Sequence, residues 1–235
     1  DEIADLSRSI ELRQSRQDTS QNGTLAEDYV DRAELYLLTK QYQSAIDDFS
    51  LSLLADGWTF LGRCLEGRGA AYMQTGRILE AFNDYTAWIE ADQDGASLPC
   101  RLLRAQCAAT LGDPLFAWAD IEFVVRAEGL NTEDGVFAAR VAAQAAQMLT
   151  ENKCQFPCHT DDARKTLEDK YRNASAELRS SEAAQFVSRA FERLNDAAAK
   201  GYNDADALEK DTALQALRSD ARWAALLATV KANRK

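Results

Sequence analysis

The chain has 235 residues, of which 46% are hydrophobic and 28% are charged, and its net charge at pH 7 is −11. These shares are ordinary for folded globular proteins, and only 3 Pro and 11 Gly are present to interrupt helices, so an all-α fold is predicted. The acidic balance argues against a nucleic-acid partner and against adsorption on anionic lipid, because both depend on Lys and Arg. Membrane insertion is not expected either, because no stretch approaches the roughly 20 apolar residues that cross a bilayer.

The first segment, residues 1–25, is expected to form an amphipathic helix followed by a linker. Ile3, Leu6 and Ile10 recur at helical spacing among polar residues. The polar run 20–24 predicts the linker. The helix is expected to pack against the element that follows it.

A 36-residue repeat occupies residues 26–133, in the segments 26–61, 62–97 and 98–133. Each segment has an Arg at its seventh position, a small residue at the eighth, Ala at the twentieth, Asp at the twenty-third and a large hydrophobic residue at the twenty-fourth. In that order they are Arg32, Arg68 and Arg104; Ala33, Gly69 and Ala105; Ala45, Ala81 and Ala117; Asp48, Asp84 and Asp120; and Phe49, Tyr85 and Ile121. A repeat of this length that runs at helical periodicity indicates stacked helix pairs.

This pattern resembles that of the tetratricopeptide repeat family, which stacks antiparallel helix pairs. The resemblance implies a right-handed α-solenoid, in which small residues at positions 8 and 20 let helices approach closely and aromatic residues fill the gap to the next pair. Turn residues agree with the register. Thr75 and Gly76 mark a turn in the second segment, and Gly112, Asp113 and Pro114 read as a helix stop, an N-cap and a first-turn proline.

The recurrent Arg and Asp have two interpretations, a ladder of binding groups or a set of framework pairs between helices. We favour the framework, because both positions adjoin packing positions, where a charged Arg needs a carboxylate partner. Arg68, Arg104 and Arg140 are the predicted framework residues. The sequence leaves open whether each pairs within its own repeat or with the Asp of the preceding one.

Residues 134–200 are predicted to be irregular, repeat-like helices. Arg140 again lies 36 residues after Arg104, and six alanines share a face of the helix expected over 134–150. The pattern then breaks at a cysteine loop, 151–160, and further helices are expected over 161–174 and 181–200.

The cysteine loop carries Cys154 and Cys158 on either side of Pro157, and a local disulfide between them is predicted. Such a bridge would favour an exported protein, periplasmic or secreted, over a cytoplasmic one. The alternative is a redox, metal-binding or haem-linked site that uses Cys154, Cys158 and His159. That alternative is disfavoured, because the spacing is one residue too long for haem attachment and zinc would lack a fourth ligand. No cofactor or metal is predicted, and Cys64, Cys100 and Cys107 are expected to be buried thiols.

The last segment, 201–235, resembles the end cap of bacterial arrays of this family. The last repeat of a solenoid exposes an apolar face, which an atypical terminal unit must cover. The residues expected to cover it are Leu214, Leu217, Trp223, Leu226 and Leu227.

In this family the first helices line a concave groove, mainly through positions 2, 5, 9 and 12. The resemblance places the following residues there: Glu27, Val30, Glu34 and Leu37; Arg63, Glu66, Ala70 and Met73; and Pro99, Leu102, Gln106 and Ala109. This surface is acidic at one end and apolar further along, which suits a protein or peptide ligand with apolar anchors and a basic end. The positions that some relatives use to grip a chaperone tail hold unsuitable residues, so that activity is not expected.

Catalysis is not predicted, because the chain has a single histidine and no glycine-rich phosphate loop. The leading hypothesis is a non-catalytic protein-interaction or assembly module. The alternatives are the cysteine-based site above and a self-associating structural solenoid.

Overall fold

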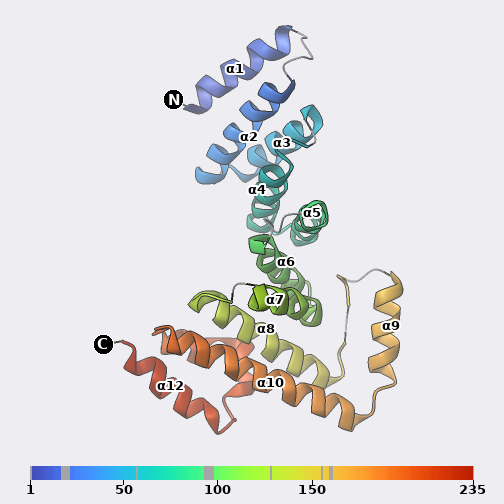
Figure 1. The fold of residues 1–235 in the computed structure, drawn as a ribbon, viewed down its shortest axis with the longest axis vertical. Helices are drawn as coiled ribbons and strands as arrows, with labels where there is room; N and C mark the ends of the chain where they lie inside the picture. Colours follow the sequence, from blue (N-terminus) through green and yellow to red (C-terminus); the bar gives the residue numbers. More distant parts are fainter. Residues whose placement is uncertain are drawn as a thin grey trace. The chain divides into compact units, whose positions relative to one another are not determined.

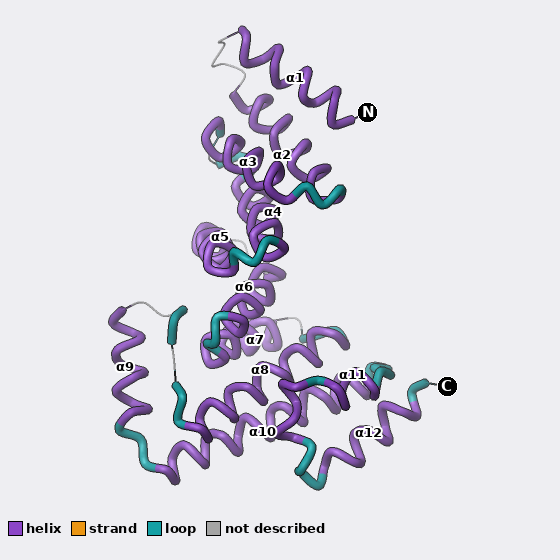
Figure 2. Tube along the Cα trace, turned by 180° about the vertical axis from the view of Figure 1, so that it is seen from behind, coloured by secondary structure: helices purple, strands orange, loops and turns teal. Residues whose placement is uncertain are grey.

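The computed structural model describes residues 2–16, 22–56, 58–92, 98–127, 129–154, 156–158 and 161–234. Within these ranges the regular structure is helical and contains no strand (Figure 2), which confirms the all-α prediction. The chain divides into two compact units, Asp1–Cys107 and Ala108–Lys235.

The first unit holds α1 (Glu2–Arg16), α2 (Asn22–Leu38), α3 (Tyr42–Ala55), α4 (Leu61–Gln74), α5 (Ile78–Ala91) and most of α6 (Leu98–Thr110) (Figure 1). The second holds α7 (Pro114–Ala127), α8 (Thr132–Glu151), α9 (Asp161–Arg172), α10 (Ala176–Ala199), α11 (Ala205–Lys210), the 3-10 helix η2 (Thr212–Leu217) and α12 (Arg222–Ala232).

Two predicted helix starts are wrong. Residues 20–24 were expected to form a linker, but α2 already begins at Asn22. The hydroxyl of Thr24, within α2, accepts a hydrogen bond from Arg13 of α1 at 2.9 Å. The helix expected to begin at residue 181 begins at Ala176. There Ser175 acts as N-cap, its hydroxyl accepting from the Leu178 N–H at 3.2 Å.

Successive helices of the first unit pack in the order of the chain: α2 on α3, α3 on α4 and α4 on α5, with α1 against α2. The turn inside each pair has a residue with positive φ at position 15 of the repeat. Gly76 (φ 76°) and Gly112 (φ 87°) fill it in the second and third repeats, and Lys40 (φ 60°) fills it in the first. The conformation is therefore a property of the repeat, although only two of the three residues are suited to it.

Glycines of α4 allow the closest helix contacts. A Cβ on Gly69, at position 8, would lie 2.7 Å from the Tyr85 ring of the same repeat, and one on Gly67 would lie 2.3 Å from the Phe49 ring of the preceding repeat. In the second repeat the small residue at position 8 thus receives the aromatic residue at position 24, and Phe49 at position 24 of the first repeat fills the gap to the next pair, as the resemblance implied.

In the first two repeats positions 1 and 27 also meet, through different chemistry in each. In the first repeat the buried Ser52 hydroxyl donates to the Ala26 carbonyl at 2.9 Å. In the second, Trp88 lies over Gly62, where a Cβ would come within 2.7 Å of the indole. Ser52 and Trp88, both at position 27, therefore each contact position 1 of their own repeat.

In the first two repeats the arginine at position 7 pairs with the Asp of its own repeat. Arg32 donates to Asp48 at 2.6 and 2.8 Å, and Arg68 donates to Asp84 twice at 2.8 Å. This resolves for the first two repeats the question that the sequence left open.

Each arginine also reaches a hydroxyl on the helix before its own pair. Arg68 donates to Ser50 of α3 at 3.0 Å, and Arg104 donates to Thr86 of α5 at 3.4 Å. Arg32 donates to Ser7 of α1 at 2.9 Å. Ser50 and Thr86 lie on the second helices of their repeats, and Ser7 of α1 accepts the equivalent hydrogen bond from Arg32. The helix α1 therefore takes the place of the second helix of a preceding repeat.

Arg140 of α8 does not pair with a residue of its own 36-residue segment. Its guanidinium pairs with Asp211, which lies 71 residues further along the chain, and Asp211 also caps η2 through the Ala213 N–H at 2.9 Å. Position 23 of this fourth segment is Phe156, which has no carboxylate. The capping segment therefore supplies the acid that the repeat lacks.

The second unit is built around α8 and α10, which pack along one another (Figure 1). All six alanines of the predicted α8 face are buried, and α9 with its flanking segments is inserted between the two helices in sequence. Leu214, Leu217, Trp223, Leu226 and Leu227 of the last segment are buried as well, as the sequence predicted.

Candidate functional site

The predicted groove residues differ in their access to solvent. Glu27, Arg63, Glu66 and Pro99 are exposed. All the other predicted groove residues except Val30 are half-buried. Val30 is completely buried, so its prediction as a groove residue is wrong. The reason is that α1, α3 and α4 all pack against α2, which leaves a narrow stripe of that helix accessible.

The acidic end of the predicted groove is organised by an ion-pair cluster. Arg63 of α4 donates from Nε to Glu34 at 2.9 Å and from Nη2 to Asp31 at 2.8 Å, both on α2. Its hydrogen bond to Glu34 is the main cause that raises the pKa of the guanidinium above its usual value. The structure thus brings together two predicted groove residues, Glu34 and Arg63, and adds Asp31.

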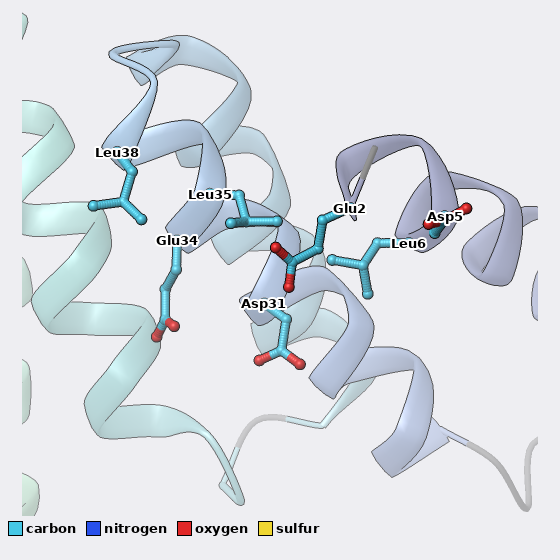
Figure 3. A pocket seen from close by; sticks show the side chains of 7 residues that line it. All are labelled: Glu2, Asp5, Leu6, Asp31, Glu34, Leu35 and Leu38. Atoms are coloured by element: carbon cyan, nitrogen blue, oxygen red, sulfur yellow. The ribbon is translucent and has the colours of Figure 1, made fainter.

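Beside this cluster, residues of α1 and α2 line an open pocket of about 520 Å³. Its lining combines acids and leucines: Glu2, Asp5, Leu6, Asp31, Glu34, Leu35 and Leu38. Figure 3 shows Asp31 and Glu34 extending to the same side of α2, with Leu6 of α1 and Leu35 of α2 on either side of Glu2. Negative charge and apolar surface therefore meet in one concavity.

Helical spacing explains how each helix contributes to this pocket. Glu2, Asp5 and Leu6 follow an i, i+3, i+4 pattern, and the α2 residues continue it over two turns, so each set lies on one face. Six of the seven lining residues were missed, because only positions 2, 5, 9 and 12 were carried over from the family. The α1 residues lie outside the repeats, and Asp31, Leu35 and Leu38 occupy other positions of the first repeat. The acidic residues on the α1 face were the available signal.

Further along the first unit the predicted surface is apolar. Met73 is half-buried, and its sulfur accepts from the Tyr85 hydroxyl at 3.5 Å. Burial raises the pKa of both the Cys100 and Cys107 thiols of α6 to about 12, so these thiols are protonated near neutral pH. Their role is to pack, in agreement with the prediction that they are buried thiols.

In the second unit, Ala109 lines a separate pocket of about 240 Å³ with Gln144, Gln147 and Met148 among its neighbours. The Gln147 amide donates to Glu151 at 2.7 Å across one turn of α8. Most of the residues that line this pocket are uncharged, unlike those of the pocket between α1 and α2.

The prediction of a disulfide between Cys154 and Cys158 is wrong. Both residues are free thiols in this structure. Phe156 between them is buried and stacks on Tyr171 of α9, with ring centroids 5.8 Å apart. The Cys158 N–H donates to the buried carboxylate of Asp113 at 3.3 Å, whereas Cys154 lines a pocket with residues of α9. The two cysteines therefore contact different helices. Because no disulfide joins them, they give no support to the prediction of an exported protein.

Asp113 links this segment to the start of α7. Its other carboxylate oxygen accepts from the Phe116 N–H at 3.1 Å, which confirms the predicted N-cap of α7. His159, the third residue of the alternative redox or metal site, lies outside the described residues. Among the residues that are described, no group of three or more His, Cys, Asp or Glu side chains could hold a metal ion. Over the same residues, none of the helices has the length and apolarity needed to cross a bilayer.

No family model matches the chain, and no curated protein sequence matches it. A solved structure does: the crystal structure of YrrB, described as a TPR protein with an unusual peptide-binding site, is similar with a TM-score of 0.55 and 14% identity. The similarity covers 97% of this chain and 92% of YrrB. The 36-residue register, the paired helices and the packing positions that recur in each repeat agree with this similarity. This protein has the fold of a tetratricopeptide-repeat protein.

Proposed function

We propose that the chain is a non-catalytic protein-interaction module that binds a peptide or helix of a partner protein on the face formed by α2, α4 and α6. The observation that carries this proposal is the pocket between α1 and α2, where acids and leucines line one concavity beside the exposed Arg63. Peptide binding in YrrB, which has the same fold, supports the same class of function here.

The charge of the face indicates the chemistry of the partner. Glu27, Glu34 and Glu66 are acids on successive first helices, and the chain as a whole carries a net charge of −11. Half-buried Leu37, Met73 and Leu102 supply apolar surface on α2, α4 and α6. A peptide with a basic end and apolar anchors complements both features.

Selection from a random peptide library displayed on phage tests this function. Enriched peptides should combine Lys or Arg with large apolar residues, and their binding should be lost in the Glu27→Lys/Glu66→Lys variant, which reverses charge on the first helices. Asp47→Lys/Glu90→Lys, which reverses two exposed acids on the second helices α3 and α5, is the matched control and should bind as the unmodified chain does. Failure to enrich any peptide, or equal losses in both variants, would contradict the proposal.

A further inference from the structure

The pocket between α1 and α2 has an apolar wall that is accessible to solvent. Leu38 keeps 80% of its surface exposed, and Leu6 and Leu35 are half-buried around the same concavity (Figure 3). Covering such a wall removes apolar surface from water and is favourable. The pocket is therefore suited to receive an apolar side chain.

The rim of the pocket is negatively charged. Glu2, Asp5, Asp31 and Glu34 contribute four carboxylates, and Arg63 supplies one positive charge to two of them. Asp31 and Glu34 carry two negative charges against the single positive charge of Arg63, and this net negative charge favours a cation beside the apolar side chain. Charge complementarity thus selects a basic ligand with an apolar neighbour.

Arg63 shows which kind of cation the rim can hold. Its Nη2 lies 2.8 Å from Asp31 Oδ1 and 2.8 Å from Glu34 Oε2, while its Nε donates to Glu34 Oε1 at 2.9 Å. A planar guanidinium can make all three contacts at once, whereas an ammonium group has no such fork. The two carboxylates, one turn apart on α2, are spaced for arginine.

The contacts of Arg63 are open to exchange. The side chains of Arg63, Asp31 and Glu34 are 42%, 44% and 45% exposed. Exposed ion pairs contribute little stability, because water screens them and the long side chains lose freedom in forming them. A second guanidinium can therefore replace the one from α4 at small cost.

We propose that this pocket receives an arginine and a neighbouring apolar side chain of a partner peptide, and that Arg63 competes with the incoming arginine for Asp31 and Glu34. The inference rests on the proposed function, since it names the part of the module that recognises the basic end of the partner. Arg63 is then a specificity-determining residue, because a partner must offer both the arginine and the apolar anchor to displace it.

Fluorescence anisotropy with a labelled amphipathic peptide that carries Leu and Arg one helical turn apart tests the competition. The Arg63→Met variant should bind this probe about three- to fivefold more tightly than the unmodified chain, the gain expected from removing an exposed competing pair. A matched probe with Lys in place of Arg should gain less. Arg126→Met removes the same charge from an α7 side chain that is 79% exposed, and it should leave the affinity for both probes unchanged.

Several outcomes would overturn the inference. Unchanged or weaker binding of the arginine probe by Arg63→Met excludes competition, and an equal gain for both probes excludes the preference for arginine. Equal gains in Arg63→Met and Arg126→Met would show a general charge effect. If the probes fail in all proteins while library-selected peptides still bind through Glu27 and Glu66, the inference is wrong and the proposed function stands.

Discussion

The guanidinium of Arg68 donates two parallel hydrogen bonds to the carboxylate of Asp84, one from Nε and one from Nη2, each 2.8 Å long. The side chains are only 19% and 10% exposed, so the pair is held between helices α4 and α5 of one repeat. A third donor of the same guanidinium reaches Ser50 on α3. One arginine therefore connects the two helices of its own repeat with the helix before them.

Removing the arginine should leave Asp84 as an unpaired, buried carboxylate. We expect Arg68→Met to lower the free energy of unfolding by about 3 kcal/mol, in the range measured for breaking buried ion pairs. Chemical denaturation of Arg68→Met, Asp84→Asn and the double variant gives the coupling, which should be about 1 to 3 kcal/mol. The control is Lys231→Met, which breaks an exposed pair with Glu209 and should cost less than about 1 kcal/mol. Additive losses in the double variant would show that the pair is not coupled.

The contact between Gly69 and Tyr85 predicts a strong response to one methyl group. In Gly69→Ala the new Cβ would lie 2.7 Å from a fully buried ring, and the overpacking should cost about 1 to 3 kcal/mol despite the better helix propensity of Ala. Gly135→Ala is the matched control on α8. There the nearest atom, Ala197 Cβ, is 3.4 Å away, so the same substitution should be neutral or stabilise by up to about 1 kcal/mol. Thermal and urea unfolding compare the two, and equal effects would argue against the close helix approach in the second repeat.

Lys40 is in the left-handed conformation that glycine adopts at the same position of the next two repeats. Because Lys40 is exposed and has little packing to lose, Lys40→Gly should stabilise the chain by about 1 kcal/mol through relief of backbone strain. The reverse test is Gly76→Ala, where φ is 76° and nothing crowds a Cβ, and it should destabilise by about 1 kcal/mol. A loss of stability in Lys40→Gly would mean that the turn of the first repeat is not strained.

The buried thiols of α6 predict how stability depends on alkaline pH. The pKa of Cys100 and of Cys107 is about 12 in the folded chain, above the ordinary value of 9.0, because burial disfavours the thiolate. Between these values the unfolded chain has lost protons that the folded chain retains. The stabilisation is therefore complete below pH 9 and is lost as pH rises towards 12, at up to about 1.4 kcal/mol per pH unit for each thiol.

Urea titrations between pH 8 and pH 10 on the unmodified chain and on Cys100→Ala/Cys107→Ala measure this dependence. The variant should lose less stability over the interval, because it lacks the two thiols. Burial also raises the pKa of several tyrosines, but these remain in both proteins and cancel in the difference. Parallel pH profiles would show that these thiols titrate alike in both states.

Some features of this protein follow from the sequence alone because they depend on neighbours along the chain. The 36-residue register, the turns at Gly76 and Gly112 and the N-cap at Asp113 are each determined within a few residues or by repetition, and each is present in the structure. The alanine face of α8 and the leucines of the cap are determined in the same way, by helical periodicity. The fold was therefore predictable before any contact was known.

Other features were decided only by the tertiary structure, because they join residues that no local pattern relates. Arg140 finds Asp211 across 71 residues, and Arg63 reaches Glu34 across 29, so both pairs depend on how whole helices pack. Packing around α2 buries Val30, and the separate attachments of Cys154 and Cys158 leave both thiols free. The pocket exists because α1 takes the place of a second helix beside α2. There the acids of α1 and Leu6 lie next to the acids and leucines of α2. A helical pattern determines which residues share a face, and only the packing of that face against another helix determines what the face encloses.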